Sequence, residues 1–290
     1  MYTFRLKKAA AIFSVKFRVT VIKIKPLMQV TITQIDTACM LISVNGFHIV
    51  TDPAFDAAGS HYPGGRAGML VKTGSPALLP AQLGAVDLVL ISHDQHKDNL
   101  DNAGREFIKT VPLVISTKEA QQRLEDTHVH GLDEWESVAI PNNKVPGLTI
   151  TATPCQHAPN KELDKGSGHV IGFIVTWLGQ QNGALYISGD TVLFEGIQEI
   201  ANRFTIDTAI LHIGHAGFPE LTGDMNFTFT GAEAIEAAHI LKARKLVPTH
   251  MEGWEHFLET PETTYSLING SDIKEKLVRL KRGEGVTIDI

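Results

Sequence analysis

ISHDQHKDNLD, at residues 91–101, carries the densest chemical signal in the chain. It places two histidines and three aspartates within eleven residues, directly after the apolar run from Val86 to Ile91. Such a run is typical of a strand covered on both faces, and layered α/β folds carry functional residues where strands end. Solvent-facing loop histidines are the plain alternative, but this density of imidazole and carboxylate favours metal contact. The segment therefore predicts a metal site at the end of a buried strand.

Three further motifs place a histidine or an aspartate where a predicted strand ends. They are TPCQH at residues 153–157, SGDT at 188–191 and VPTH at 247–250. Imidazole and carboxylate groups from several strand ends can enclose a divalent ion such as Zn²⁺ or Mn²⁺ and leave one position to water. Taken singly, Asp190 is better explained as a turn cap, and His157 and His250 as core or surface histidines. Only the ordered set favours ligands.

No competing catalytic motif occurs in the sequence. The chain has neither the G-x-S-x-G turn of a serine hydrolase nor a Walker loop. The nearest approach to a dinucleotide fingerprint, GSGHVIG at residues 166–172, has the wrong spacing and precedes a predicted strand rather than a helix.

The four motifs, in this order, resemble those of the metallo-β-lactamase superfamily over roughly residues 28–290. Members carry H-x-H-x-D-H after a core strand, then a lone histidine, a bridging aspartate in a Gly-Asp turn and a final histidine. The early motif TDP at residues 51–53 resembles the branch that includes ascorbate 6-phosphate lactonase and N-acylphosphatidylethanolamine phospholipase D. The resemblance implies an α/β fold, an αββα sandwich of two mixed sheets with helices on the outer faces.

The first motif departs from the family pattern and can be aligned in two registers. Aligned from the strand end, His93 is the first ligand and one residue is inserted before His96. Aligned backwards from NLD at residues 99–101, Asp94 takes the place of the first histidine. Both registers keep His96 and Asp98, and both lose the last histidine. This loss shifts the expectation from two tightly bound zinc ions toward manganese, magnesium or a single occupied site.

The resemblance implies one or two divalent ions, zinc before manganese, and a hydrolytic reaction. One ion would be held by His96, His157 and either His93 or Asp94. Asp190 would bridge to a second ion, completed by Asp98 and His250. Metal-bound hydroxide would attack an ester, lactone or phosphodiester bond. His96 and Asp98 are the predicted catalytic residues, and Asp98 is also placed to take the proton of the water.

Other polar residues near these motifs have two interpretations each. His212 and His215 follow a predicted strand and either line the pocket or replace the missing ligand. The simpler structural interpretation is preferred for the remaining residues, which are Cys155 as a small buried side chain, Trp254 with Glu252 and His256 as packing near the pocket mouth, and His128 with His130 as surface residues.

Charge and cysteine content restrict the partners. Residues 1–27 hold seven of the 26 basic residues and none of the 32 acidic ones, which leaves 19 basic against 32 acidic residues in the remainder. An acidic body binds nucleic acid and anionic membranes poorly, so a small-molecule substrate, anionic or not, is expected, and homo-oligomers remain open. The two cysteines, Cys39 and Cys155, form no disulfide framework and favour a reducing compartment, the cytoplasm.

The N-terminal residues 1–27 differ from the rest of the chain. They are basic and acid-free, but the apolar run from Ala9 to Val15 is too short for a signal core or a membrane-spanning helix. We therefore predict an N-terminal extension outside the fold at 1–27, with Met28 as the working start, and one hydrolase domain at 28–290.

Alternating strands and helices are expected along that domain. A β-hairpin is predicted around Asn45-Gly46, and residues 56–86 are interpreted as one long functional loop. Strands are expected near 148–153, 169–177, 184–187, 208–213, 245–248 and 286–290, and helices near 118–125, 195–204 and 231–243. Two other functions remain open: a nuclease of the same superfamily, which the acidic body disfavours, and a regulatory module whose metal centre has decayed.

Overall fold

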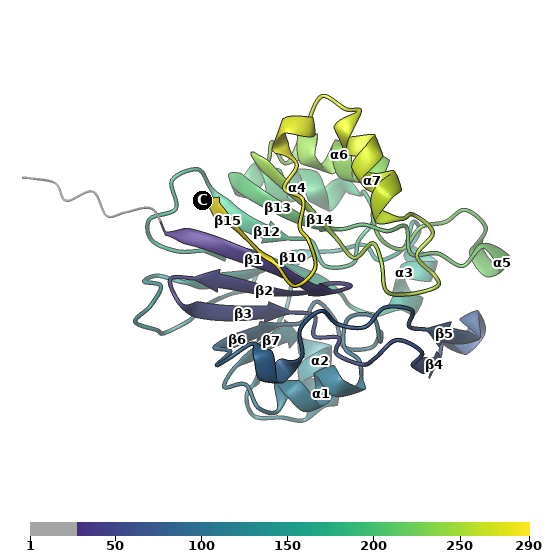
Figure 1. Ribbon diagram of the computed structural model, residues 1–290, viewed down its shortest axis with the longest axis horizontal. Helices are drawn as coiled ribbons and strands as arrows, with labels where there is room; N and C mark the ends of the chain where they lie inside the picture. The colour runs from purple at the N-terminus through teal and green to yellow at the C-terminus, as the bar shows by residue number, and fades with distance from the viewer. Residues whose placement is uncertain (1–27) are drawn as a thin grey trace, which may run out of the picture.

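Two β-sheets packed face to face form the centre of the molecule, as the computed structural model shows for residues 28–290 (Figure 1). The predicted N-terminal extension at 1–27 lies outside the described residues. The first sheet has the order β15-β1-β2-β3-β6-β7-β8 and is mixed, because β3, β6, β7 and β8 run parallel. Its strands are β1 (Gln29–Asp36), β2 (Cys39–Val44), β3 (Phe47–Thr51), β6 (Leu88–Leu90), β7 (Val114–Thr117), β8 (Val129–Leu132) and β15 (Gly285–Asp289).

The second sheet has the order β14-β13-β12-β11-β10-β9 and is also mixed. β12, β13 and β14 run parallel, whereas β9 to β12 are antiparallel neighbours. The carboxyl ends of β10, β12, β13 and β14 therefore lie at one edge. Its strands are β9 (Ser137–Ala139), β10 (Thr149–Pro154), β11 (Ile171–Thr176), β12 (Ala184–Ile187), β13 (Ile206–His212) and β14 (Lys245–Thr249).

Helices cover the outer face of each sheet, which completes the expected αββα sandwich. Figure 1 shows α1 (Asn102–Ile108) and α2 (Lys118–Leu124) on the first sheet, and α4 (Glu195–Arg203), α6 (Gly231–Ile240) and α7 (Pro261–Asn269) on the second. One apolar core, with Ile42 and Phe173, lies between the sheets. Two further cores lie under the helices, one with Val89 and Phe107 and one with Tyr186 and Ile197. Burial of these apolar faces is the main force that stabilises the layers.

The predicted hairpin forms between β2 and β3. Val44 pairs with Phe47 across a two-residue turn, in which Asn45 and Gly46 have φ values of 48° and 75°. Positive φ at both central residues matches the right-handed twist of the strands, and Asn-Gly adopts it readily.

The sequence had suggested one long loop at residues 56–86, but in the structure short elements interrupt this segment. They include a short hairpin of β4 (His61–Pro63) and β5 (Met69–Val71), connected through the 3₁₀ turn Gly65–Ala67, and a second 3₁₀ turn at Pro80–Gln82. The strands have only three residues each, too few for a periodic pattern. The remaining helices are α3 (Lys161–Ser167), α5 (Pro219–Thr222) and the 3₁₀ turn Lys274–Lys276. None of the helices in residues 28–290 has the length and apolar composition needed to span a bilayer.

Candidate metal centre

The loops that follow β6, β10, β12 and β14 meet at one edge of the sandwich. His93, His96 and Asp98 lie after β6 of the seven-stranded sheet. His157, Asp190 and His250 lie after β10, β12 and β14 of the six-stranded sheet, so each sheet supplies half of the set. The structure thus brings together six of the seven residues predicted to bind metal, in two groups of three.

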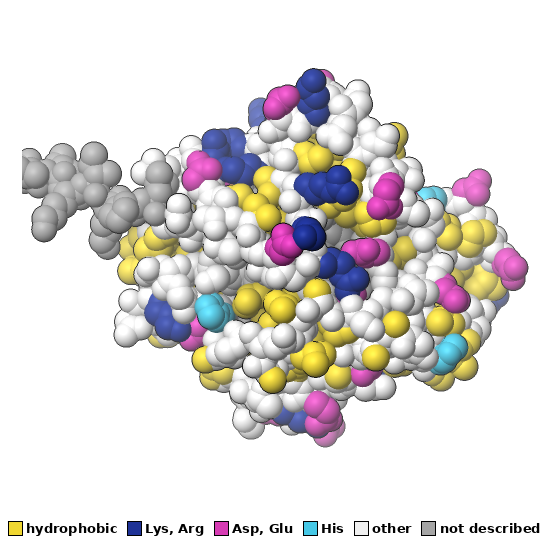
Figure 2. All heavy atoms as spheres, in the orientation of Figure 1, with side chains coloured by type: hydrophobic (Ala, Val, Ile, Leu, Met, Phe, Trp, Pro, Cys, Tyr) yellow, Lys and Arg dark blue, Asp and Glu magenta, His cyan; other side chains and the backbone are white. Residues whose placement is uncertain are grey.

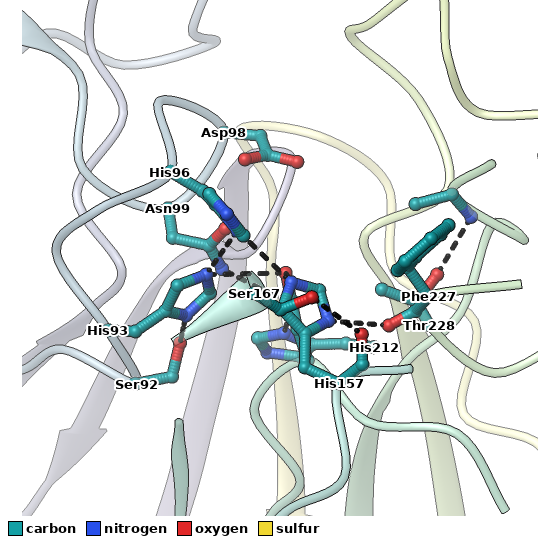
Figure 3. A network of polar contacts seen from close by, with 12 residues as sticks. Ser92, His93, His96, Asp98, Asn99, His157, Ser167, His212, Phe227 and Thr228 are labelled. Carbon is teal, nitrogen blue, oxygen red and sulfur yellow. Dashed lines mark hydrogen bonds and ion pairs between the residues drawn. The ribbon is translucent and has the colours of Figure 1, made fainter. Parts of the chain in front are cut away.

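Three imidazoles form the first group. The Nε2 atom of His93 lies 2.9 Å from Nδ1 of His96, and Nε2 of His157 lies 3.1 Å from the same atom. Figure 3 shows the rings of His93, His96 and His157 turned toward one another. His93 and His157 are buried, and His96 is half-buried. Three ring nitrogens that point to one place are the ligand arrangement of many zinc centres.

The hydrogen bonds around His157 fix which of its nitrogens is free. Its Nδ1 lies 2.6 Å from the carbonyl oxygen of Phe227, which can only accept, so Nδ1 carries the proton and the lone pair of Nε2 faces the other imidazoles. Burial lowers the pKa of the His157 imidazole to about 4, although the nearby Asp190 carboxylate opposes this shift. Burial likewise lowers the pKa of His93 well below its usual value. Both rings are therefore neutral at pH 7, and each can offer the lone pair of a ring nitrogen to a cation.

Asp98, Asp190 and His250 form the second group. Nε2 of His250 lies 3.7 Å from Oδ2 of Asp98 and 3.6 Å from Oδ1 of Asp190. This nitrogen is buried and has no hydrogen-bond partner among the described residues, while Nδ1 of the same ring donates to the carbonyl of Ile213 at 3.3 Å. A buried, unsatisfied ring nitrogen between two carboxylates is expensive unless another group, such as a cation, completes it.

Asp190 lies between the two groups. Its Oδ2 is 3.9 Å from Nε2 of both His93 and His157, and its Oδ1 faces His250. Burial alone would raise the pKa of Asp190, but the electrostatic influence of the His250 imidazole and the hydrogen bond from His212 hold it well below its usual range. The donor set, imidazole nitrogen on one side and carboxylate oxygen on the other, fits one or two divalent ions and leaves their identity open between zinc and manganese.

Of the two residues that compete for the first position of the motif, the structure places His93, and not Asp94, beside His96 and His157. Asp94 lies outside both groups. Its two carboxylate oxygens share the N–H of Arg123 Nε, at 2.9 and 3.1 Å, and Oδ1 also accepts from Nη2 of Arg123. Arg105 adds a contact at 3.6 Å. The metal role predicted for Asp94 is therefore not supported, because its charge is already neutralised by two guanidinium groups on α1 and α2.

Asn99 occupies the position of the missing histidine. It is fully buried, and its Nδ2 donates to Oδ1 of Asp190 at 3.2 Å. The amide thus contacts the Asp190 carboxylate from the place where the family pattern has an imidazole. Its oxygen has no hydrogen-bond partner among the described residues. The second group accordingly has one nitrogen donor, His250.

Two further histidines contact the carboxylates of this centre. Nδ1 of His212 donates to Oδ1 of Asp190 at 2.7 Å, and Nε2 of the same ring faces the buried carboxylate of Asp52 at 3.9 Å. The sequence had left His212 open between a pocket residue and a replacement for the missing ligand. His256, interpreted from the sequence as packing, lies with Nε2 at 3.2 Å from Oδ2 of Asp98. Burial would raise the pKa of Asp98, but the hydrogen bond from His256 and its electrostatic influence reverse this and lower it well below its usual value. His215 belongs to neither group, and its Nε2 has no hydrogen-bond partner among the described residues.

Cys155, His128 and His130 were interpreted from the sequence as residues without a metal role. Cys155 is half-buried rather than fully buried, and its thiol donates to the carbonyl of Ser188 at 3.1 Å. His130 is exposed on β8, and Nδ1 of His128 contacts the Asp126 carboxylate, so both lie away from the centre.

A cavity of about 330 Å³ opens onto the metal centre. Its polar lining includes His96, Asp98 and His157, and its apolar lining comes from the β4–β5 hairpin and the segment 216–227. This volume is within the range of small-molecule pockets.

Comparison with known proteins gives consistent results in sequence and structure. A model of the beta-lactamase superfamily domain matches residues 48–251. A metal-dependent hydrolase of Pyrococcus horikoshii is 28% identical over 219 residues, which cover 73% of this chain and 87% of the relative. One from Pelotomaculum thermopropionicum is 29% identical over 243 residues, 77% of this chain and 97% of the relative.

Solved structures show the same fold at lower identity. An isothiocyanate hydrolase from Delia radicum gut bacteria aligns with a TM-score of 0.75 at 21% identity, over 90% of this chain and 100% of that one. A metallo hydrolase from Ignicoccus hospitalis aligns with a TM-score of 0.65, also at 21% identity, over 90% of this chain and 99% of the other.

Proposed function

Because the chain belongs to the beta-lactamase superfamily, with the domain at residues 48–251, we propose that it hydrolyses an ester, lactone or phosphodiester bond of a small metabolite. It is a metal-dependent hydrolase, the activity for which its archaeal and bacterial relatives are named. The TDP motif at residues 51–53 supports a place in the lactonase-like branch, since Asp52 lies beside the His212 that binds the bridging Asp190.

The observation that carries the proposal is the fixed ring of His157. Its Nδ1 donates a hydrogen bond to the Phe227 carbonyl, and this leaves Nε2 unprotonated, 3.1 Å from Nδ1 of His96. The His157 side chain forms part of the cavity wall. An imidazole held in this way by a second partner is typical of a metal ligand. His93, His96 and His157 would hold the first ion, and Asp98, Asp190 and His250 the second.

A divalent ion bound there would lower the pKa of a coordinated water to about 7 and stabilise negative charge on the substrate oxygen. We propose that the carboxylate of Asp98, which lines the cavity, accepts the proton of the attacking water. His256 would orient that carboxylate through its hydrogen bond. Asn99 and His212 would orient Asp190 in the same way.

The function is tested by metal analysis and a substrate screen on the purified protein. We expect at least one zinc or manganese ion per chain, and hydrolysis of p-nitrophenyl esters, aliphatic lactones or bis(p-nitrophenyl) phosphate. The variant His157→Ala is expected to lose metal and at least about a hundredfold of kcat/KM. His130→Ala, an exposed histidine, is the matched control and should retain both.

The outcomes separate the remaining functions. Metal without turnover of any of the three bond classes would favour a regulatory module, and cleavage of DNA or RNA alone would favour a nuclease. The 32 acidic against 26 basic residues disfavour nucleic acid as the substrate. The thiols of Cys39 and Cys155 are both unpaired, which supports the cytoplasm as the proposed compartment.

A further inference from the structure

Two cavities adjoin at the metal centre. The inner cavity, of about 330 Å³, contacts His96, Asp98 and His157. The outer cavity, of about 720 Å³, lies between β5 and the segment that contains α5. Both are lined by Ala67, Leu70, Phe218 and His256. These four shared residues make the two cavities parts of one groove that leads from the candidate ligands to the surface.

Aromatic rings line the inner part of this groove next to the metal centre. The Phe227 ring lies 6.3 Å from the ring of His157, and Phe218 lies 5.9 Å from Phe227. Phe218 also stacks on His256, at 5.4 Å and an interplanar angle of 15°. The rings thus touch the partner of Asp98 on one side and a candidate ligand on the other. Both phenylalanines line the cavity next to the candidate ligands.

Exposed aliphatic side chains line the outer part. Met69 on β5 is 58% exposed, Leu221 on α5 is 48% exposed, and Leu258 after β14 is 42% exposed. Figure 1 shows the β4–β5 hairpin and α5 at the same end of the molecule, and hydrophobic side chains gather at that end in Figure 2. Large apolar side chains that remain exposed around a cavity mark a binding surface more often than single scattered ones do.

The charges along the groove are few and mixed. The outer part has Arg66 together with Glu220 and Glu255. In the inner part, the Lys97 ammonium donates to Oδ1 of Asn102 at 3.0 Å. The lining residues of the two cavities include no cluster of arginines or lysines that would bind a polyanion. The groove therefore suits a neutral group.

We propose that the substrate consists of a small hydrolysable head and an uncharged apolar tail, and that the tail lies in the groove between β5 and α5. The inference rests on the proposed function, because the head is defined by the metal centre. The inference is drawn from the continuity of the two cavities, because the same four residues line both the cavity at the candidate ligands and the larger cavity beyond it, where Met69, Leu221 and Leu258 are exposed. The tail would displace water from Leu70, Phe218 and Leu221.

Binding of a graded series of ligands tests the tail independently of turnover. Isothermal titration calorimetry of the metal-loaded full chain with acetohydroxamate, butanohydroxamate, hexanohydroxamate and octanohydroxamate keeps the chelating head constant and varies only the chain. Each added methylene group is expected to tighten binding roughly threefold. The kcat/KM of the matching p-nitrophenyl esters should rise in parallel.

Charged substitutions on the two walls locate the tail. Met69→Asp and Leu221→Asp should leave acetohydroxamate affinity within about twofold of the wild type but reduce the gain per methylene to less than about twofold. Leu178→Asp is the matched control, because Leu178 is 69% exposed and lines neither cavity, and it should behave as the wild type. All three side chains are exposed, so the fold should tolerate the changes.

The results distinguish this inference from the hydrolase assignment. If no ester is hydrolysed while hydroxamate affinity still rises with chain length and falls in Leu221→Asp, the result would support tail binding in the groove and refute the proposed ester hydrolysis. Esters cleaved at rates independent of chain length would leave the reaction intact and overturn the groove. Equal effects of Leu221→Asp and Leu178→Asp would also overturn it. So would a wild-type dimer that Leu221→Asp dissociates in sedimentation velocity, since a second copy would then cover the groove.

Discussion

His93 and Asp94 are neighbours in the chain, yet their side chains bind different partners. The His93 ring faces His96 and Asp190, whereas the Asp94 carboxylate is held by Arg123. Of these adjacent residues, His93 faces the proposed metal position, and Asp94 attaches α2 to the loop. Both side chains are buried, so removal of either should be measurable.

Replacement of each residue gives opposite results for metal content and stability. His93→Ala should lower the bound metal per chain and the activity by at least about a hundredfold, because one of three imidazoles is lost. Asp94→Ala should retain the metal but lower the free energy of unfolding by about 1–3 kcal/mol, since Arg123 loses its partner. Elemental analysis and urea denaturation measure the two quantities. Loss of metal in Asp94→Ala would restore the alternative register.

Asn99 limits the second group of ligands to one nitrogen. The variant Asn99→His should increase the affinity of the second metal position by about 10- to 100-fold, because an imidazole would replace an amide at the bridging carboxylate. A competition titration with a chromogenic chelator measures this. Asn99→Gln is the control, which keeps the amide and should not gain affinity. An unchanged second affinity in a folded Asn99→His protein would show that the position does not point to the ion.

At the level of elements, α1 determines how closely the first motif approaches the segment after β3. A Cβ added at Gly104 would lie 1.9 Å from the carbonyl oxygen of Pro53, so the helix can pack there only with glycine. The Asp101 side chain caps the helix by accepting from the Gly104 amide at 2.7 Å. This contact holds α1 beside Asp52 and fixes the end of the ligand loop.

Gly104→Ala should therefore destabilise the protein by about 1–3 kcal/mol, although alanine favours helices more than glycine does. Gly166→Ala in α3 is the control: an added Cβ meets no atom within 4 Å, and a gain of up to about 1 kcal/mol is expected. The midpoint of urea denaturation compares the two. Equal stability of both variants would contradict the close packing of α1.

Elements with a complete local signal were predictable from the sequence. The turn at Asn45-Gly46 and the strand Ala184–Ile187 appear where the sequence placed them. α1 was not predicted, because seven residues give too little periodicity and its cap, Asp101, had been aligned with the metal motif. α7 was also missed, although Thr260 caps it and Pro261 stands at its first position, a signal that the sequence does contain.

The site shows the same division. Six candidate ligands were identified because each follows a strand, and strand ends of a layered fold share an edge. The choice between His93 and Asp94 depended on Arg123, a partner 29 positions from Asp94 that no local pattern reveals. His256 is 158 positions from Asp98, and only the three-dimensional fold brings it there.

At the scale of the whole molecule, the metal centre connects the two sheets. Three candidate ligands follow strand β6 of one sheet, and three follow strands of the other. A cation bound by both halves is absent from the unfolded state, so its binding free energy adds to the stability of the sandwich.

Chelation should therefore lower the melting temperature. Free metal at a hundred times its dissociation constant stabilises by about 2.7 kcal/mol, which corresponds to a Tm shift of a few degrees for a domain of this size. Differential scanning calorimetry with EDTA, and with zinc or manganese restored, measures the shift. The His157→Ala variant should show a smaller response. A wild-type Tm that does not change upon chelation would place the ions outside the folded centre.

The pairing of β15 with β1 has a consequence for synthesis on the ribosome. Gln29 is opposite Asp289 and Thr33 is opposite Gly285, so nearly the whole described sequence separates these two paired strands. During translation, β1 therefore leaves the ribosome long before the strand that covers its outer edge exists. Its unpaired backbone groups must meanwhile avoid other nascent chains, and this interval is when the polypeptide is most exposed to misassembly and to the need for a chaperone.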